Sequence, residues 1–518
     1  MGKVCPDLNI SEVFDMKKML SLLLALLMLS SLLLVACADV DDPEGETQGA
    51  QSEVETGDPN YTDDVPELDF GGETVTILSR DKFGVNDEFY AESNTDTQSD
   101  VVASAVYNRN MNIENRLDVT LEMLMDDTDP TAKHSTAVKS GSSDYDIVAD
   151  STYIIIQAVL KGEFLNLRDL QYVDLDKYYW TQGYNDIVSF GEQSKQYLAS
   201  GALALSMFRY MFVTVYNREV FEDLGETDLY EVVNNGEWTL EYQNQIIADR
   251  YQDISEPINK KDDRDMYGLI TGDTVSVDPY CVAANIQLVS KNDDGTWYYN
   301  TDQFERTVEL CGKIQAIYNN PSTYVFKGAT VDDTGKTDIV EAFAASKSMM
   351  ATVQVFALET NVGDLAEFDY GIAPMPKFDE NQENYATYVQ DQVTGIGVSS
   401  SISDEDTMAM MGAVLECMAS ESYATVVDAY YSTALSYQYL QNPESKEMLD
   451  LIYDSLTFDF VGACSNIIMN NGGTSIRDQL RPLFSGKSTK LGSTLQKWQK
   501  STDRALGKIN DYLAELEY

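Results

Sequence analysis

The sequence is poor in histidine and in basic residues. Its 518 residues include one histidine, His134, and 35 Lys and Arg against 86 Asp and Glu, for a formal net charge of −51. Zinc hydrolases, Ser-His-Asp triads and Cys-His pairs all need histidine in a defined arrangement, so these chemistries are excluded unless His134 itself is the base. The negative charge disfavours nucleic acid and anionic substrates. We therefore predict no catalytic residues, no metal, no cofactor and no nucleic-acid partner.

Cysteine is also scarce. Apart from two near the N-terminus, the cysteines are widely spaced and form no CxxC pair: Cys281, Cys311, Cys417 and Cys464. This spacing indicates neither a zinc motif nor a dense disulfide framework. In an exported protein these four cysteines either pair or remain buried thiols, and the sequence leaves both possibilities open.

One long apolar run is present, in residues 16–37, MKKMLSLLLALLMLSSLLLVAC. Two lysines precede about 16 apolar residues, which at ~1.5 Å each are too short for a ~30 Å hydrocarbon core and are typical of a signal peptide. The ending Leu-Val-Ala-Cys resembles the bacterial lipobox, in which the chain is cut before a cysteine that receives a diacylglycerol. We predict a signal peptide over residues 1–36, a true start at Met16, and lipidation of Cys37. A membrane anchor that ends in Ala-Cys by chance is the alternative.

The lipobox resemblance implies a protein on the extracellular face of the cytoplasmic membrane, held there by a lipid anchor. Residues 38–69 contain twelve acidic residues and no Lys or Arg. Such a segment buries too little apolar surface to fold, so residues 37–69 are predicted to be a lipidated cysteine and a disordered tether. The roughly 450 residues that follow exceed the about 250–300 that one core supports, which predicts two or more domains.

The folded part begins with an α/β pattern. A β-branched strand at 74–78, a helix at 99–117 and a strand at 118–123 predict a βαβ unit with a parallel sheet. A third strand is expected at 145–150. Ligands of open α/β sheets bind beyond the carboxyl ends of the strands, so Asp150 and Tyr153 are candidates for a binding loop. Alternatively, Asp150 caps the helix that begins at Tyr153.

The rest of the chain also contains both segments with the apolar pattern of strands and segments with the apolar pattern of helices. We expect strands at 207–217, 266–270, 348–353, 368–376 and 392–399, and a hairpin whose acidic turn, 292–295, lacks the further carboxylates of a calcium loop. Thr239 is expected to cap a helix. Further helices are predicted at 301–318, 341–347, 404–419, 422–431, 443–455, 476–484 and 491–516.

Several segments, in this order, resemble extracellular solute-binding proteins of ABC importers, in the large carbohydrate-type family (family 1). They include FGGETVTIL, YDIVAD, FVTVYNREVFEDLG, GEWTLE, EAFAASKSMMATVQVFALE and YGIAPMPKFDENQENY, and the resemblance covers about residues 70–518. It implies an α/β, two-lobe periplasmic-binding-protein-like (type II) fold. Lobe 1 would comprise 70–212 plus about 396–430, and lobe 2 would comprise 213–395 plus about 431–518. Hinge strands are expected at 210–216 and 394–398, with Gly395 and Gly397 as hinge residues.

The same resemblance implies capture of a small solute, with a saccharide or oligosaccharide favoured, and delivery to an ABC permease by a monomer. Sugars need flat apolar faces and fixed hydroxyl partners. By their place relative to the segments that carry the resemblance, nine residues are candidates for ligand binding: Asp150, Tyr153, Arg209, Tyr210, Trp238, Asp278, Tyr280, Gln354 and Phe356. A structural role remains open for each of them, and a core position above all for Trp238. Two alternatives stay open: a surface glycoside-active enzyme, and a ligand-binding sensor subunit without transport.

Overall fold

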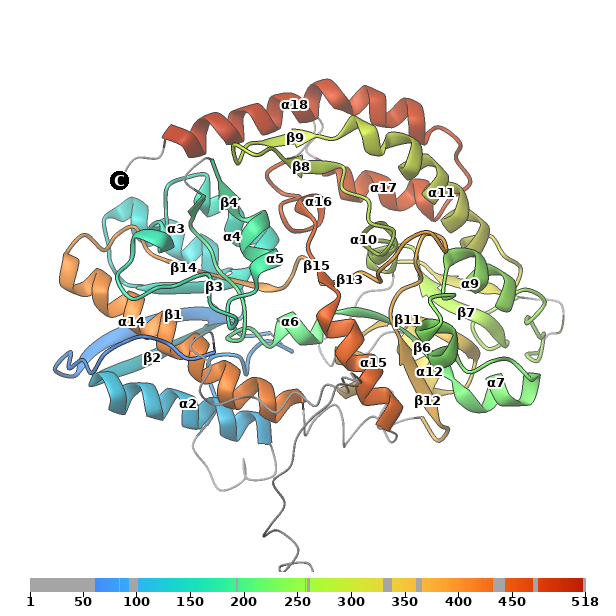
Figure 1. Ribbon diagram of the computed structural model, residues 1–518, viewed down its shortest axis with the longest axis horizontal. Helices are drawn as coiled ribbons and strands as arrows, with labels where there is room; N and C mark the ends of the chain where they lie inside the picture. Colours follow the sequence, from blue (N-terminus) through green and yellow to red (C-terminus); the bar gives the residue numbers. More distant parts are fainter. Residues whose placement is uncertain are drawn as a thin grey trace, which may run out of the picture. The chain divides into compact units, whose positions relative to one another are not determined.

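The fold is built on two separate β-sheets, each covered by helices (Figure 1). The computed structural model describes residues 61–82, 84–92, 101–191, 194–256, 258, 261–328, 338–359, 366–431, 443–468 and 474–515. The predicted signal peptide and Cys37 lie outside the described residues. All structural statements below concern the described ranges.

The first sheet has the strand order β14-β3-β1-β2. Its strands are β1 (Glu73–Arg80), β2 (Val119–Asp126), β3 (Ile147–Ser151) and β14 (Thr394–Val398). β1 pairs in parallel with both β2 and β3, while β14 runs antiparallel to β3. The helix α2 (Val101–Leu117) connects β1 to β2. The predicted parallel βαβ unit is therefore confirmed.

Three further helices pack in this half: α3 (Pro130–Ser140), α4 (Thr152–Val159) and α14 (Glu405–Glu421). α14 comes from a distant part of the sequence, and in Figure 1 it runs diagonally from the left edge towards α2, which it contacts. Smaller elements complete the half: η2 (Leu167–Asp169), α5 (Gln182–Ile187), β4 (Ser189–Phe190), β5 (Lys195–Gln196) and the π-helical turn η6 (Ser422–Val427).

The second sheet has the order β10-β7-β11-β6-β12. Its strands are β6 (Phe212–Asn217), β7 (Tyr267–Gly272), β10 (Thr323–Phe326), β11 (Ser348–Gln354) and β12 (Tyr370–Ala373). β7 pairs in parallel with β10 and β11, and β6 runs antiparallel to its two neighbours. β6, β7 and nearly all of β11 are buried, as expected for central strands covered on both faces.

The helices of the second half precede or follow these strands. They are α7 (Arg218–Leu224), α8 (Leu229–Asn234), α9 (Leu240–Ile246), η3 (Val275–Val277), α10 (Pro279–Ala283), η4 (Thr301–Gln303), α11 (Phe304–Tyr318) and α12 (Asp338–Ala344). The predicted cap is confirmed, because the Thr239 hydroxyl accepts a hydrogen bond from the Tyr242 amide at 3.2 Å. The predicted hairpin is also present, with β8 (Val289–Lys291) antiparallel to β9 (Trp297–Tyr299).

The C-terminal part adds α15 (Pro443–Asp454), α16 (Phe460–Ala463), α17 (Ile476–Phe484) and α18 (Leu491–Glu515). A short pair, β13 (Thr387–Tyr388) with β15 (Leu456–Thr457), joins this part to the middle of the chain. α18 runs along α11 and β9 and also contacts β4 of the first half (Figure 1).

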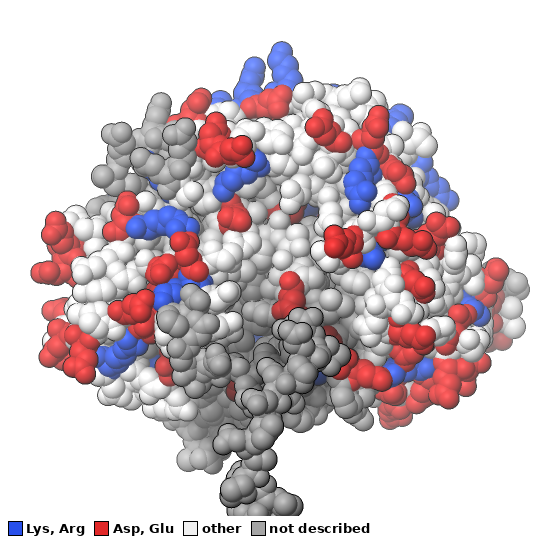
Figure 2. Space-filling model, viewed as in Figure 1, with Lys and Arg blue, Asp and Glu red and all other residues white. Residues whose placement is uncertain are grey.

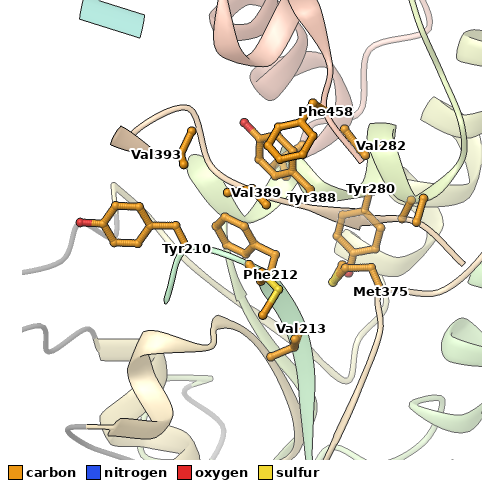
Figure 3. Close-up of a cluster of buried hydrophobic side chains, with 14 of the residues drawn as sticks. Tyr210, Phe212, Val213, Tyr280, Val282, Met375, Tyr388, Val389, Val393 and Phe458 are labelled. Atoms are coloured by element: carbon orange, nitrogen blue, oxygen red, sulfur yellow. The ribbon is translucent and has the colours of Figure 1, made fainter. Parts of the chain in front are cut away.

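Among the described residues, two segments connect a strand of one sheet with a strand of the other, and they lie side by side. The first crossing contains α6 (Ser206–Arg209), and the second comprises residues 389–393. Met211 bridges Val389, and the Gln390 amide donates to the Tyr210 carbonyl at 3.1 Å. Figure 3 shows Val389 and Val393 of the second crossing near Phe212, at the start of β6.

The structure corrects two details of the predicted crossings. The predicted strand over 207–217 begins only at Phe212, because Ser206–Arg209 forms a helical turn whose first amide is held by the Glu88 carboxylate at 2.6 Å. The segments predicted as crossing strands each lie inside one sheet. Gly395 is packed rather than free, since an added Cβ would lie 2.6 Å from the Tyr184 hydroxyl. A hinge role for Gly395 and Gly397 stays a prediction.

The folded body begins earlier than Phe70, where the sequence predicted its start. Arg116 pairs with both carboxylate oxygens of Asp63, at 2.6 and 2.9 Å, and Lys177 pairs with Asp64 at 2.8 Å. Tyr61 stacks on Tyr178 with ring centroids 4.7 Å apart. The last residues of the predicted tether therefore pack on the first half. The arginine and the lysine of the first half neutralise aspartates whose own segment contains no basic residue.

Three of the four widely spaced cysteines are buried, Cys281 is half-buried, and all four are free thiols. In the described part of the chain, no helix combines the length and apolar character that crossing a membrane requires. The face in Figure 2 carries Asp and Glu side chains over both halves and fewer Lys and Arg, some of which lie at the top edge above α18.

Candidate functional site

A small pocket lies beyond the carboxyl end of β7, where ligands of α/β sheets bind. Its walls come from three places: the segment Val277–Leu288, Tyr388 of β13, and the C-terminal part, where α16, its N-cap Asp459 and α17 contribute. Its volume is about 30 Å³. Because one buried water needs about 10–15 Å³, the pocket holds a group of two or three heavy atoms.

Two arginines of α17 line the pocket, and each is held by an aspartate. Arg481 donates to Asp278 through Nε, at 2.8 Å, and through Nη2. Arg477 forms an ion pair with Asp391 of the second crossing. Both aspartates are more than nine-tenths buried. Burial disfavours the charged arginine, yet the hydrogen bonds and charge of Asp278 raise the pKa of Arg481 above its usual value.

The pocket is also lined by an acidic residue, Asp459, that has no described arginine within hydrogen-bonding distance. Asp459 caps the start of α16, and its Oδ2 accepts from the Gly462 amide at 2.9 Å. Burial raises the pKa of Asp459 to about 7, against the opposing effect of its backbone hydrogen bonds. This carboxyl therefore keeps its proton to higher pH than an exposed aspartate does.

Segments next to the pocket contact the first half of the molecule. The Tyr153 amide donates to the Asp391 carbonyl at 3.2 Å, and the Asn466 side chain donates to the Tyr153 carbonyl at 2.6 Å. Phe458 packs edge-on against Tyr184 of α5, with centroids 5.9 Å apart. The segment that bears Asp459 thus contacts both the predicted binding loop at Tyr153 and the second sheet.

Of the predicted ligand-binding residues, Asp278 lines this pocket directly. Tyr153 does not line the pocket, and its backbone contacts the neighbouring residues Asp391 and Asn466. Tyr280, two residues after Asp278, is fully buried, and its hydroxyl donates to Gln243 at 3.4 Å. Its ring therefore packs in the core of the second half.

Four other predicted residues gather at the crossings instead. Arg209 donates to Asp87 and to Glu359, and its guanidinium lies 5.9 Å from the centre of the Phe356 ring. Gln354 donates to Gln390 at 2.6 Å, beside the Tyr210 carbonyl that the Gln390 amide contacts.

The Arg209 cluster is an interior ion network. Burial pushes the pKa of Asp87 upward, but the charge and hydrogen bonds of Arg209 outweigh it and lower that pKa. Burial raises the pKa of Glu359, and Arg209 and the Tyr430 hydroxyl offset this only in part. The network links a turn of the first half, the first crossing and the segment after β11.

The remaining two candidates lie apart from both groups. The Asp150 carboxylate is buried and accepts from the Thr131 amide, at 3.3 Å, and hydroxyl, at 2.7 Å. It thereby holds the start of α3, whereas α4 begins at Thr152, and its N-cap residue is Ser151, which forms no side-chain cap hydrogen bond. Trp238 is fully buried, and its Nε1 donates to the Pro374 carbonyl at 2.8 Å. These contacts give both side chains a structural role, and ligand contact by either stays a prediction.

The ligand-binding residues predicted from the sequence do not include Arg481, Asp459 and Tyr388, all of which line the pocket. They also do not include Asp391, which pairs with Arg477. One signal for the arginines was available: Arg477 and Arg481 are four residues apart in a predicted helix and so share one face. No local pattern marks the other residues. In the described ranges, no group of three or more His, Cys, Asp or Glu side chains is arranged to hold a metal ion.

Comparison with known proteins identifies the fold. No protein-family model and no curated protein matches the sequence. Among solved structures, UgpB of Mycobacterium tuberculosis in complex with glycerophosphocholine matches with a TM-score of 0.50 at 15% identity, over 85% of this chain and 100% of its own. The uncharacterized protein lmo0859 of Listeria monocytogenes also gives a TM-score of 0.50, at 14% identity, over 84% and 100%.

A third structure is the galacto-N-biose-/lacto-N-biose I-binding protein of the ABC transporter from Bifidobacterium longum. It has a TM-score of 0.49 and 13% identity, over 84% of this chain and 98% of its own. At such identities the likeness to UgpB and lmo0859 shows the fold and nothing further. The predicted α/β periplasmic-binding-protein-like fold is confirmed.

Proposed function

We propose that this chain captures a small solute outside the cytoplasm and delivers it to an ABC permease. The observation that carries the proposal is a pocket with apolar walls and a few polar groups at the carboxyl end of the second sheet, next to segments that contact the first half, within a binding-protein fold. Small-molecule sites usually lie in such positions between two parts of a fold. The chain acts as a monomer and catalyses no reaction.

A saccharide or oligosaccharide is the solute we favour. The proposal rests on the family resemblance of the sequence and on the pocket's mixture of apolar walls with carboxyl and hydroxyl groups. The fold itself does not select a sugar, since UgpB carries glycerophosphocholine in its crystal structure. The two-lobe division proposed above, with hinge closure around the solute, would present the loaded state to the permease.

The test is a thermal-shift screen of the purified chain against sugars, oligosaccharides, amino acids and peptides. A solute at about a hundred times its dissociation constant adds about 2.7 kcal/mol of stability, which raises the melting temperature. We expect a shift with one sugar class and recovery of that sugar uncleaved. A shift with peptides alone would overturn the saccharide proposal, and no shift with any compound would overturn solute capture.

A glycoside-active enzyme is the second candidate, and one observation favours it. Asp278 and Asp459 line the same pocket, one paired with arginine and the other with its pKa raised to about 7. Unequal carboxyl pairs are what glycoside hydrolysis requires. However, both oxygens of Asp278 accept hydrogen bonds from Arg481, and the positive charge of Arg481 makes this carboxylate a weaker nucleophile and base. Release of a cleaved sugar in the screen above would favour the enzyme.

The membrane attachment is a separate proposal. We infer that Cys37 is lipidated after removal of residues 1–36 and that it holds the protein on the extracellular face of the cytoplasmic membrane. Cys37→Ser should release the protein into the soluble fraction, with Cys417→Ser as the control that stays attached. Retention of the Cys37→Ser variant in membranes would contradict the anchor.

A further inference from the structure

Three buried polar atoms on residues that line the pocket have no hydrogen-bond partner among the described residues. One is Nε of Arg477, which lies 3.6 Å from the Asp478 carboxylate, and the other two are oxygens, the Tyr388 hydroxyl and Oδ1 of Asp459. Tyr388 is 2% exposed, and its ring stacks over Phe212 with centroids 5.9 Å apart (Figure 3). Burying a polar atom without a partner is costly, and native structures seldom do so without a reason. Both oxygens belong to residues that line the same small space.

The two arginines that line this space already have carboxylate partners. Arg481 is paired with Asp278, and Arg477 with Asp391. Asp478 lies beside both arginines, 3.0 Å from Nη1 of Arg481 and 3.6 Å from Nε of Arg477. An anionic ligand would have to break one of these pairs and leave a buried carboxylate without its cation, which is strongly unfavourable.

The other walls are apolar. They are formed by side chains such as Val277, Val282, Leu288, Leu480 and Phe484. With about 30 Å³, the space accepts a carbon atom or two with an oxygen, while the remainder of a larger ligand must lie outside. Apolar walls and these two oxygens suit an alcohol group whose carbon meets the walls and whose oxygen meets Tyr388 and Asp459.

We propose that this pocket binds an alcohol group of an uncharged solute, that Tyr388 and Asp459 are its hydrogen-bonding partners, and that the two arginine–aspartate pairs exclude anionic solutes. The inference rests on the proposed function and deepens it, because it names the ligand's charge class and the residues that select it. A hydroxyl both donates and accepts, so it matches the Tyr388 hydroxyl together with either form of the Asp459 carboxyl.

The test compares matched uncharged and anionic solutes on the full chain by calorimetry: glycerol with glycerol 3-phosphate, glucose with glucose 6-phosphate and glucuronate, and the same pairing for any sugar found in the screen. We expect the uncharged member of a pair to bind and the anionic member to bind at least about tenfold more weakly. Tyr388→Phe keeps the ring on Phe212 and should weaken binding about five- to tenfold, the effect of one lost hydrogen bond.

Tyr299→Phe is the matched control, because the Tyr299 hydroxyl is also buried and without a hydrogen-bond partner among the described residues, yet Tyr299 does not line the pocket. It should bind as the unchanged protein does. Equal or tighter binding of anionic solutes, or unchanged affinity in Tyr388→Phe, would overturn the inference and leave solute capture intact. No binding of any solute by the unchanged protein would overturn both.

Discussion

At the scale of single residues, this protein buries charged side chains at positions that the pattern of apolar residues in the sequence does not mark as interior. Arg209 is 5% exposed and is bound by Asp87 from one side and by Glu359 from the other. The surface of the chain is strongly acidic, so its few cations matter most where they compensate buried carboxylates. Buried charges of this kind tolerate the loss of a partner poorly.

The first prediction concerns that network. Arg209→Gln removes the only positive member and leaves Asp87 and Glu359 uncompensated, so unfolding in urea should show a loss of about 3–5 kcal/mol. Arg168→Gln is the control, because Arg168 pairs with the exposed Asp176 at 3.4 Å and such pairs contribute about 1 kcal/mol or less. Equal losses in the two variants would contradict the role assigned to Arg209.

The second prediction concerns pH. Glu416 of α14 accepts hydrogen bonds from the Tyr179 hydroxyl and from Nε1 of Trp180, at 3.0 Å, and is 1% exposed. Burial raises the pKa of Glu416 to about 7. The folded state therefore binds its proton more tightly than the unfolded state does. This contribution to stability is complete below the ordinary pKa and is lost as pH rises from about 4.5 to 7.

Glu416→Gln mimics the protonated form, since its amide can donate to Tyr179 and accept from Trp180. We expect the unchanged protein to lose on the order of 2 kcal/mol between pH 5 and 8 relative to this variant, measured by urea unfolding at each pH. Glu405→Gln, at an exposed position near the start of the same helix, should keep the pH dependence. Parallel pH profiles for the unchanged protein and Glu416→Gln would refute the assignment.

At the scale of elements, close packing overrides helix propensity at one glycine. Gly412 lies within α14, and a Cβ added there would approach the Gln171 carbonyl oxygen to 2.0 Å. That carbonyl belongs to the backbone and cannot rotate away as a flexible side chain would. Glycine therefore allows α14 to approach the segment around Gln171 closely.

The third prediction follows from this contact. Gly412→Ala should destabilise the protein by about 1–3 kcal/mol, although alanine is the better helix former. In the matched variant Gly312→Ala, the new Cβ on the exposed side of α11 meets nothing within 4 Å and should stabilise by up to about 1 kcal/mol. Thermal unfolding of both variants tests the difference, and a stabilised Gly412→Ala would show that α14 is not packed as described.

At the scale of the whole molecule, the chain passes between the two sheets through short segments that contact each other. Buried polar residues brace these segments: Thr394 donates to Glu88 at 2.6 Å and accepts from Arg80 at 2.6 Å. Burial raises the pKa of Glu88, against the charge of Arg80. A change in how the two halves meet would therefore have to involve this region.

The fourth prediction rests on the proposed function. A solute identified in the thermal screen should reduce the radius of gyration of the protein in solution scattering, because closure brings the halves together. Tyr388→Phe at saturating solute should reach the same compact state at a higher solute concentration. An unchanged radius at saturation would count against closure and would leave solute binding itself untouched.

Most of the secondary structure follows from the sequence, because its causes are local. Helix 476–484 was predicted with the bounds that the structure has, and β11 and α11 were located within a few residues. Periodic apolar positions and side-chain caps such as Thr239 depend on neighbours three or four residues away. The prediction failed at Ser206–Arg209, where the distant Glu88 carboxylate holds the first amide of a helical turn.

The sequence by itself determined the α/β class, the parallel unit at the start of the folded body, and the acidic character of the surface. Tertiary structure decided the pocket, because its partners are remote in sequence: Arg481 lies 203 positions from Asp278. No local pattern records which carboxylate will face which arginine, or that Trp238 and Tyr280 will be fully buried. Those outcomes depend on how the two sheets and the C-terminal helices pack, and therefore on long-range burial rather than on local hydrogen bonding.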